Sequence, residues 1–149
     1  MTSAPFRSAL PVASTGPTRW RELVELVRRF GQYPTAAEAE RRTRVVLSAL
    51  GPHVVGDERV DLVRRLPEEA ALLIASRVPA TRKLTAAEFV ESVAPRIPGA
   101  TPATARWDVS SVLSVLPQLV GDDLTDRILH QLPPGYALLF GRAELKQSA

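Results

Sequence analysis

The apolar residues of this chain recur with the period of an α-helix. Between residues 18 and 31 they fall at every third or fourth position, which places them on one face of a helix. This first stripe consists of Trp20, Leu23, Val24, Val27 and Phe30. Gly31 is a natural stop after it, so the pattern predicts a helix over residues 18–31. A second stripe, which ends before Gly51, consists of Ala36, Ala39, Thr43, Val46, Leu47 and Leu50.

Threonine residues mark where further helices begin. Thr35 and Thr85 are each followed three residues later by glutamate, the spacing of a capping box. Thr101 is followed by proline, whose missing N–H costs nothing in the first turn of a helix. We therefore expect helices to begin after these three threonines, and the last of them to run to Leu116 and stop at Pro117.

Two more helices are predicted in the first half from about residue 56 onward. The first carries Val60, Leu62, Val63 and Leu66. Pro67 then redirects the chain, and Glu68 and Glu69 complement the positive end of the next helix dipole. Residues 122–132 repeat the first of these patterns, and Pro133 repeats the turn after it.

The chain repeats itself with an offset of 66 residues. When residues 22–73 are placed against residues 88–139, 18 of the 52 pairs are identical, whereas composition alone gives roughly four or five. Most shared positions are apolar, as expected when each unit buries its apolar face against its copy. A half of about 60 residues is marginal on its own. The sequence therefore predicts an all-α fold, a single compact domain of two pseudo-symmetric four-helix repeats (about eight helices) that share one core.

The predicted boundaries follow from this repeat. Repeat one spans residues 18–82 and repeat two spans residues 83–145, which together form the helical domain 18–145. Residues 1–17 lack helical periodicity and acidic side chains, and we expect a disordered N-terminal tail there. Residues 146–149 form a short C-terminal tail.

Each repeat carries two apolar motifs that belong to a known pattern. They stand at Val46-Leu47 to Leu50 and Leu66-Pro67 to Leu72, and again at Val112-Leu113 to Leu116 and Leu132-Pro133 to Leu138. With these motifs, the chain from about Trp20 to Phe140 resembles the bacterial domain-of-unknown-function 2267 family. The resemblance implies a helical fold and a bacterial setting, and it implies no established activity. The second repeat departs from the family pattern at Trp107, where a charged residue is usual.

The two halves differ most in charge. Residues 1–82 carry 13 arginines and 9 acidic residues, a net charge of +4, whereas residues 83–149 carry 6 basic and 7 acidic residues, a net charge of −1. Seven arginines of the first half have no basic counterpart 66 positions later. They are Arg28, Arg29, Arg41, Arg42, Arg44, Arg64 and Arg65. If they converge, they form an anion-binding surface for phosphate or an acidic helix; the alternative is an ordinary surface, because glutamates are interleaved with them.

Trp107 is the opposite kind of candidate. It stands at the position of Arg41 in the second repeat, so helical geometry directs it away from the core of its own repeat. A large indole there packs between the repeats, closes a dimer or receives a partner. Val115 lies nearby in the sequence, and Tyr136 raises the same question. We take Trp107, Val115 and Tyr136 as candidate partner-binding residues.

No pattern indicates a catalytic or metal-binding site. The chain has no cysteine, which excludes disulfides and thiolate chemistry and fits a reducing cytoplasm. His53 and His130 lie outside any catalytic or metal-ligand motif, and the acidic cluster at residues 122–126 suits the first turn of a helix. We therefore expect no catalytic residue, no metal ligand and no cofactor.

No apolar run approaches the ~20 residues of a membrane-spanning helix. We therefore expect a soluble cytoplasmic protein that does not enter a membrane. The first functional hypothesis is a non-enzymatic helical interaction module that binds another protein, or a second copy, on the side of Trp107 and Tyr136. The alternative is nucleic-acid or phosphate binding through the arginines of the first repeat.

Overall fold

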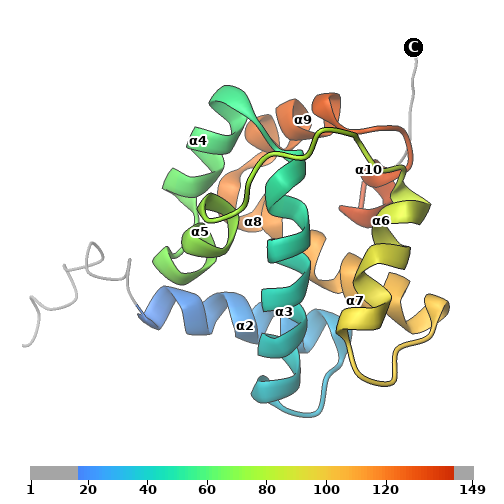
Figure 1. The fold of residues 1–149 in the computed structure, drawn as a ribbon. Helices are drawn as coiled ribbons and strands as arrows, with labels where there is room; N and C mark the ends of the chain where they lie inside the picture. The colour runs from blue at the N-terminus through green and yellow to red at the C-terminus, as the bar shows by residue number, and fades with distance from the viewer. Residues whose placement is uncertain (1–16, 143–149) are drawn as a thin grey trace, which may run out of the picture.

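The computed structural model describes residues 17–142, and this part of the chain is built from helices without a strand (Figure 1). The helices of the first half are α2 (Pro17–Gly31), α3 (Ala36–Leu50), α4 (Gly56–Arg65) and α5 (Glu68–Ala75). Those of the second half are α6 (Ala86–Val93), α7 (Pro102–Leu113), α8 (Leu116–Val120), α9 (Asp122–Gln131) and α10 (Tyr136–Leu139). Short 3-10 turns follow α3 (Gly51–His53) and α6 (Ala94–Arg96). The all-α fold predicted from the sequence is thus confirmed.

The predicted tails fall almost wholly outside the described residues. This holds for the C-terminal tail, 146–149, and for the N-terminal tail, 1–17, except that Pro17 is the first residue of α2. Within the described range, no helix combines the length and the apolar character that a bilayer crossing requires.

The threonine caps fix where three helices begin. The hydroxyl of Thr35 accepts a hydrogen bond from the amide of Glu38, and α3 begins one residue after this threonine. Thr85 forms the complete capping box that was predicted, because the Glu88 side chain also accepts from the Thr85 amide at 2.9 Å. At Thr101 the side chain that accepts from the backbone amide of the capping residue belongs to a threonine and not to a glutamate. The local signals in the sequence therefore locate these helix starts.

Pro117 does not end a helix as predicted, because α7 already ends at Leu113. Pro117 instead lies in the first turn of the short helix α8. Backbone nitrogens there donate no intrahelical hydrogen bond, so the missing N–H of proline costs nothing. The amide of Val115 bonds the carbonyl of Val112, and the amide of Gln118 bonds that of Val115. These turns join α7 to α8 and carry the chain around the core.

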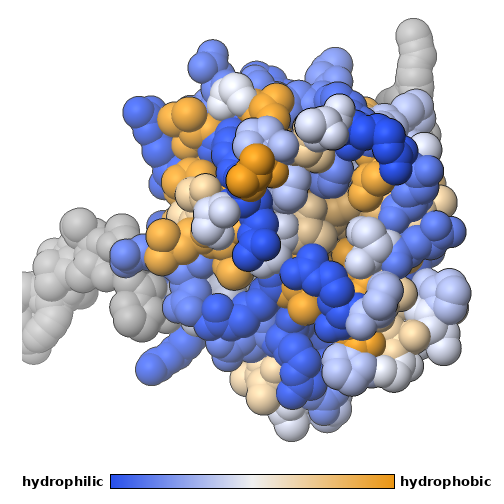
Figure 2. Space-filling model, viewed as in Figure 1, coloured by the Kyte–Doolittle hydropathy of each residue, from blue (hydrophilic) through white to orange (hydrophobic). Residues whose placement is uncertain are grey.

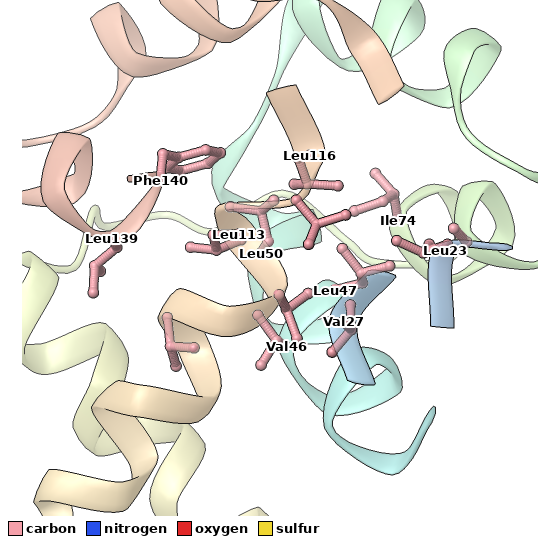
Figure 3. Packing of buried hydrophobic residues seen from close by; sticks show 14 of the residues in the cluster. Leu23, Val27, Val46, Leu47, Leu50, Ile74, Leu113, Leu116, Leu139 and Phe140 are labelled. Atoms are coloured by element: carbon pink, nitrogen blue, oxygen red, sulfur yellow. The ribbon is translucent and has the colours of Figure 1, made fainter. Parts of the chain in front are cut away.

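Both halves contribute to one hydrophobic core, and α3 lies at its centre. Figure 1 shows α3 running through the middle of the molecule, and α3 contacts α2 and α5 of the first half and α6 and α7 of the second. Leu47, Leu50 and Leu113 are fully buried there, and Figure 3 shows leucines of both halves directed into the same interior. The predicted sharing of one core therefore describes the molecule.

Three residues of the predicted apolar stripes are not in the core, and one of them is Ala36, which is exposed at the start of α3. Phe30, near the end of α2, is 47% exposed, and Val60 on α4 is 50% exposed. Figure 2 shows apolar side chains of this kind dispersed among hydrophilic ones over α4 and α5. A helical stripe extends beyond the core where its helix does, so the residues at either end of a stripe are the least certain to be covered.

Two ion pairs join residues that stand 66 positions apart. The Arg42 Nε atom of α3 lies 3.5 Å from Oδ1 of Asp108 on α7. The Arg127 Nη2 atom of α9 lies 3.2 Å from Oδ2 of Asp61 on α4. Each pair therefore connects a position of the first half to the matching position of the second, with opposite charges at the two ends.

A second set of bonds links α4 and α9 at their ends. Arg65, the last residue of α4, donates to the carbonyl of Val120 just before α9, at 2.7 Å. Gln131, the last residue of α9, donates to the carbonyl of Val55 just before α4, at 2.8 Å. Because Gln131 stands 66 positions after Arg65, matching residues of the two halves perform matching roles.

Candidate partner-binding site at Trp107

Trp107 connects the two halves and is also exposed. It lies on α7, and its Nε1–H donates to the carbonyl of Gly31 at the end of α2, at 3.0 Å. The side chain is nevertheless 50% exposed. The hydrogen bond satisfies the only polar group of the indole and fixes its orientation, so an aromatic surface is held open to solvent.

Next to Trp107, three side chains form a polar cluster at the interface between the two halves, which we call the seam. Tyr33 donates its hydroxyl to Oδ1 of Asp108 at 2.5 Å, and Asp108 is only 4% exposed. Arg42 approaches the same carboxylate oxygen, and its guanidinium carbon lies 5.0 Å from the centre of the Tyr33 ring. A buried carboxylate is costly unless it is paired and hydrogen-bonded, and here both conditions are met.

Arg42 is incompletely satisfied within this cluster. Its Nη1 donates to the carbonyl of Glu38, one turn earlier on α3, at 3.2 Å. Its Nε is buried and makes no hydrogen bond to any acceptor in the part of the chain that the structure describes. The 3.5 Å approach to Asp108 gives electrostatic attraction without the geometry of a hydrogen bond.

A hollow of about 290 Å³ opens beside these residues. Tyr33, Arg42, Trp107 and Asp108 line it, together with Thr104 and the loop 97–100 that precedes α7. We call this feature the Trp107 hollow. It combines one open aromatic side chain, one buried ion pair and one donor that has no acceptor among the described residues.

The other two candidate partner-binding residues are not at the surface. Val115 is fully buried in the joint between α7 and α8, and Tyr136 is 1% exposed. The Tyr136 hydroxyl donates to the carbonyl of Leu84, and its ring meets the edge of Phe89 at a centroid distance of 5.6 Å. In this fold neither Val115 nor Tyr136 presents its side chain at the surface. Ala70, which aligns with Tyr136, is also buried, so the two halves cover the same position.

Tyr33 and Asp108 belong to the site but were not among the residues predicted from the sequence. They lie 75 residues apart, so no local motif joins them. One signal could have identified Asp108. It stands at the position of Arg42 in the other repeat, and opposite charges at matching positions are able to pair when the two copies pack face to face.

The candidate anion-binding arginines are held mainly by carboxylates of their own half. Arg28 and Arg29 both pair with Glu25, at 2.6 and 3.5 Å. The hydrogen bond from Arg28 lowers the pKa of the Glu25 carboxyl, so this acid stays ionised. Arg44 pairs with Glu40 at 2.9 Å and also with Glu69.

The remaining arginines are directed elsewhere. Arg42 belongs to the cluster beside Trp107, and Arg65 donates to a backbone carbonyl of the second half. Arg41 and Arg64 are exposed on α3 and α4, and neither has an acceptor within residues 17–142. The seven arginines are thus divided among separate partners, and the structure does not bring them together into one set of free guanidinium groups.

The histidines and acids were also considered as chemical groups. His53 packs against the edge of Phe89, and burial, followed by the nearby Lys83, lowers the pKa of its imidazole. The Nδ1 atom of His130 contacts the carbonyl of Asp126 at 2.9 Å. Over the described stretch, no three His, Cys, Asp or Glu side chains come together as a possible metal site.

The two tyrosines of the chain predict how stability depends on pH. Burial is the main cause that raises the pKa of both Tyr33 and Tyr136, and the hydrogen bond to Asp108 adds to it for Tyr33. Above about pH 10 the unfolded chain releases phenolic protons that the folded chain retains, so stability falls as pH rises. We expect phenolate absorbance to appear only as the helical circular dichroism is lost. Phenolate absorbance that rises near pH 10 in a fully helical protein would contradict this.

A search of the curated proteins finds no match. The family model described as "Uncharacterized conserved protein (DUF2267)" matches residues 20–139, which include every residue of the Trp107 hollow. The match covers most of the chain, and it extends from the buried Trp20 to Leu139 at the end of α10. The chain therefore belongs to the DUF2267 family of uncharacterized conserved proteins.

Proposed function

We propose that this domain is a non-enzymatic binding module, and that Trp107 and the Trp107 hollow form its contact site for another protein. The observation that carries the proposal is the half-exposed indole, whose only polar group is already bonded to Gly31. A large aromatic side chain held in a fixed orientation loses little conformational freedom on binding. Tryptophan is accordingly enriched among the residues that dominate protein interfaces.

The surroundings of Trp107 favour a contact surface. Phe30, which is also about half exposed, immediately precedes the residue that binds the indole. The ionisable groups of the hollow, Arg42 and Asp108, are engaged with each other and with Tyr33. This mutual pairing suits groups that maintain the shape of a site. We propose a bacterial cytoplasm as the setting of this module, which the cysteine-free sequence and the family resemblance support.

A peptide selection would test the proposal. Peptides selected from a displayed library against the folded domain are expected to bind in competition with one another at Trp107. Trp107→Ala is expected to weaken their binding by at least tenfold, because truncating a tryptophan at the centre of an interface typically costs about 2 kcal/mol or more. Affinity is measured by calorimetry, and circular dichroism checks that the variant is folded.

Leu72→Ala is the matched control, because Leu72 is an exposed apolar residue on α5 and does not line the hollow. It should leave the affinity of the peptides unchanged. Equal affinities for wild type and Trp107→Ala would show that Trp107 is not part of a contact site.

A further inference from the structure

The Trp107 hollow lies where the second half lacks an aromatic residue that the first half has. Gly99 stands 66 positions after Tyr33, and each residue lies two positions before the threonine that caps the next helix. Tyr33 is buried against Gly31, whereas a Cβ atom added to Gly99 would meet no atom within 4 Å. With a φ of +78°, Gly99 also has a backbone conformation that side chains rarely adopt. The loop 97–100 therefore leaves the space beside it open.

The polar groups around this space are also matched between the halves. In the first half, the Tyr33 hydroxyl reaches Asp108. The position that matches Asp108 is Arg42, whose buried Nε lacks a hydrogen-bond acceptor among the described residues. Arg42 lines the hollow, and within residues 17–142 its guanidinium makes one hydrogen bond, from Nη1 to the carbonyl of Glu38, so an oxygen placed in the hollow could accept from another of its N–H groups. The Asp108 carboxylate beside it could accept a proton in return, because each carboxylate oxygen has room for more than one hydrogen bond.

These two groups select among possible occupants of the hollow. A carboxylate would accept from the Arg42 guanidinium, but it would be repelled by Asp108 and by Glu38, which lies 3.8 Å from Arg42 Nη1. An ammonium group has no acceptor atom to offer the Arg42 guanidinium. A purely apolar ring would offer no acceptor to Arg42 and no donor to Asp108. A neutral hydroxyl on an aromatic ring accepts from Arg42 and donates to Asp108, while the ring contacts Trp107.

We propose that the Trp107 hollow receives a tyrosine side chain of the partner protein. On the side of the second half, this tyrosine occupies the position that Tyr33 occupies on the side of the first half. This inference rests on the proposed function, because it names the chemistry of the group that the contact site accepts. The hollow of about 290 Å³ lies near the lower end of the size range of ligand pockets, so it suits one side chain.

The test uses p-cresol, which is the tyrosine side chain in isolation, with toluene and benzoate as comparison probes. Each is titrated into the full chain while the indole N–H resonance of Trp107 is followed by NMR, with assignment by Trp107→Phe. We expect a saturable shift with p-cresol and binding about tenfold weaker with toluene, which lacks the hydroxyl. Benzoate should bind no better than toluene. Equal affinities for p-cresol and toluene, or no shift with p-cresol, would overturn the inference.

Arg42→Lys tests the guanidinium donor without removing the positive charge, because lysine lacks the planar set of guanidinium N–H groups. It should reduce p-cresol affinity to that of toluene, and thermal melting shows whether the variant is folded. If Arg42→Lys does not fold, the comparison of p-cresol with toluene on the wild-type chain decides the inference alone. Arg41→Lys is the control, because Arg41 is exposed and does not line the hollow.

The selected peptides separate this inference from the proposed function. Peptides that bind at Trp107 and lose affinity when their tyrosine is changed to phenylalanine support both. Peptides without tyrosine that bind at Trp107 just as tightly would overturn the tyrosine inference and leave the binding module intact. If p-cresol binds saturably but no selected peptide depends on Trp107, the proposal of a protein partner is wrong and the hollow is a site for small phenols.

Discussion

Replacement of Leu47 by alanine is expected to lower the free energy of unfolding by about 3 to 5 kcal/mol, the cost of truncating a fully buried leucine. Leu47 lies on α3, which packs against helices of both halves. The loss should therefore affect the whole domain and not the first half alone. Leu113→Ala, at the matching position of the second half, should have a similar effect for the same reason.

Chemical denaturation followed by circular dichroism measures both losses, and amide hydrogen exchange shows where protection is reduced. In each variant we expect one cooperative transition, with protection lowered in both halves together. Leu72→Ala on the exposed side of α5 should change stability by less than about 0.5 kcal/mol. Two separate transitions, with only the mutated half affected, would show that the halves have independent cores.

Replacement of Asp108 by alanine is expected to cost about 3 kcal/mol, because it leaves the Tyr33 hydroxyl without its acceptor and Arg42 without its buried counter-charge. The Tyr33 hydroxyl loses its 2.5 Å hydrogen bond, and Arg42 loses the nearer of its carboxylate neighbours. Equilibrium unfolding in urea at neutral pH measures the change. Asp108→Asn retains an acceptor for Tyr33 and removes the charge, so it should cost less than Asp108→Ala.

A double-mutant cycle isolates the contact between Tyr33 and Asp108. Tyr33→Phe and Asp108→Ala should show a coupling energy of about 1 kcal/mol or more, as is usual for residues in one buried hydrogen-bonded network. Tyr136→Phe serves as the control, because its hydroxyl bonds the Leu84 carbonyl and not the cluster. Additive effects of Tyr33→Phe and Asp108→Ala would mean that the seam is not held by this bond.

The sequence predicted the fold where the determining interactions are local. The stripe in residues 18–31 and the threonine caps at residues 85 and 101 depend on neighbours within one or two turns, and these features match the structure. Pro117 was misassigned because proline is compatible both with the end of one helix and with the first turn of the next. Only the packing of α8 distinguishes the two cases.

The site was harder to predict because it depends on the packing of distant segments. Trp107 was found as an aromatic residue at a position that is charged in the first repeat, and the structure places it at the surface of the seam. The burial of Tyr136 and Val115 was not predicted, because sequence spacing does not show which residues the α7–α8 joint and the last helix cover. The role of Tyr33 depends on a contact across 75 residues, which only the folded chain reveals.

The opposite charges at positions 66 residues apart have a consequence for how neighbouring chains behave during synthesis. Suppose that the first halves of two different molecules packed together in the way that the two halves of one molecule do. Arg42 of one would then face Arg42 of the other, and Asp61 would face Asp61. Like charges placed face to face in a buried contact cost several kcal/mol. On a polysome, where first halves emerge side by side before their own second halves are made, this repulsion opposes exchange of halves between chains. The first half of each nascent chain is therefore favoured to pair with the second half of the same chain.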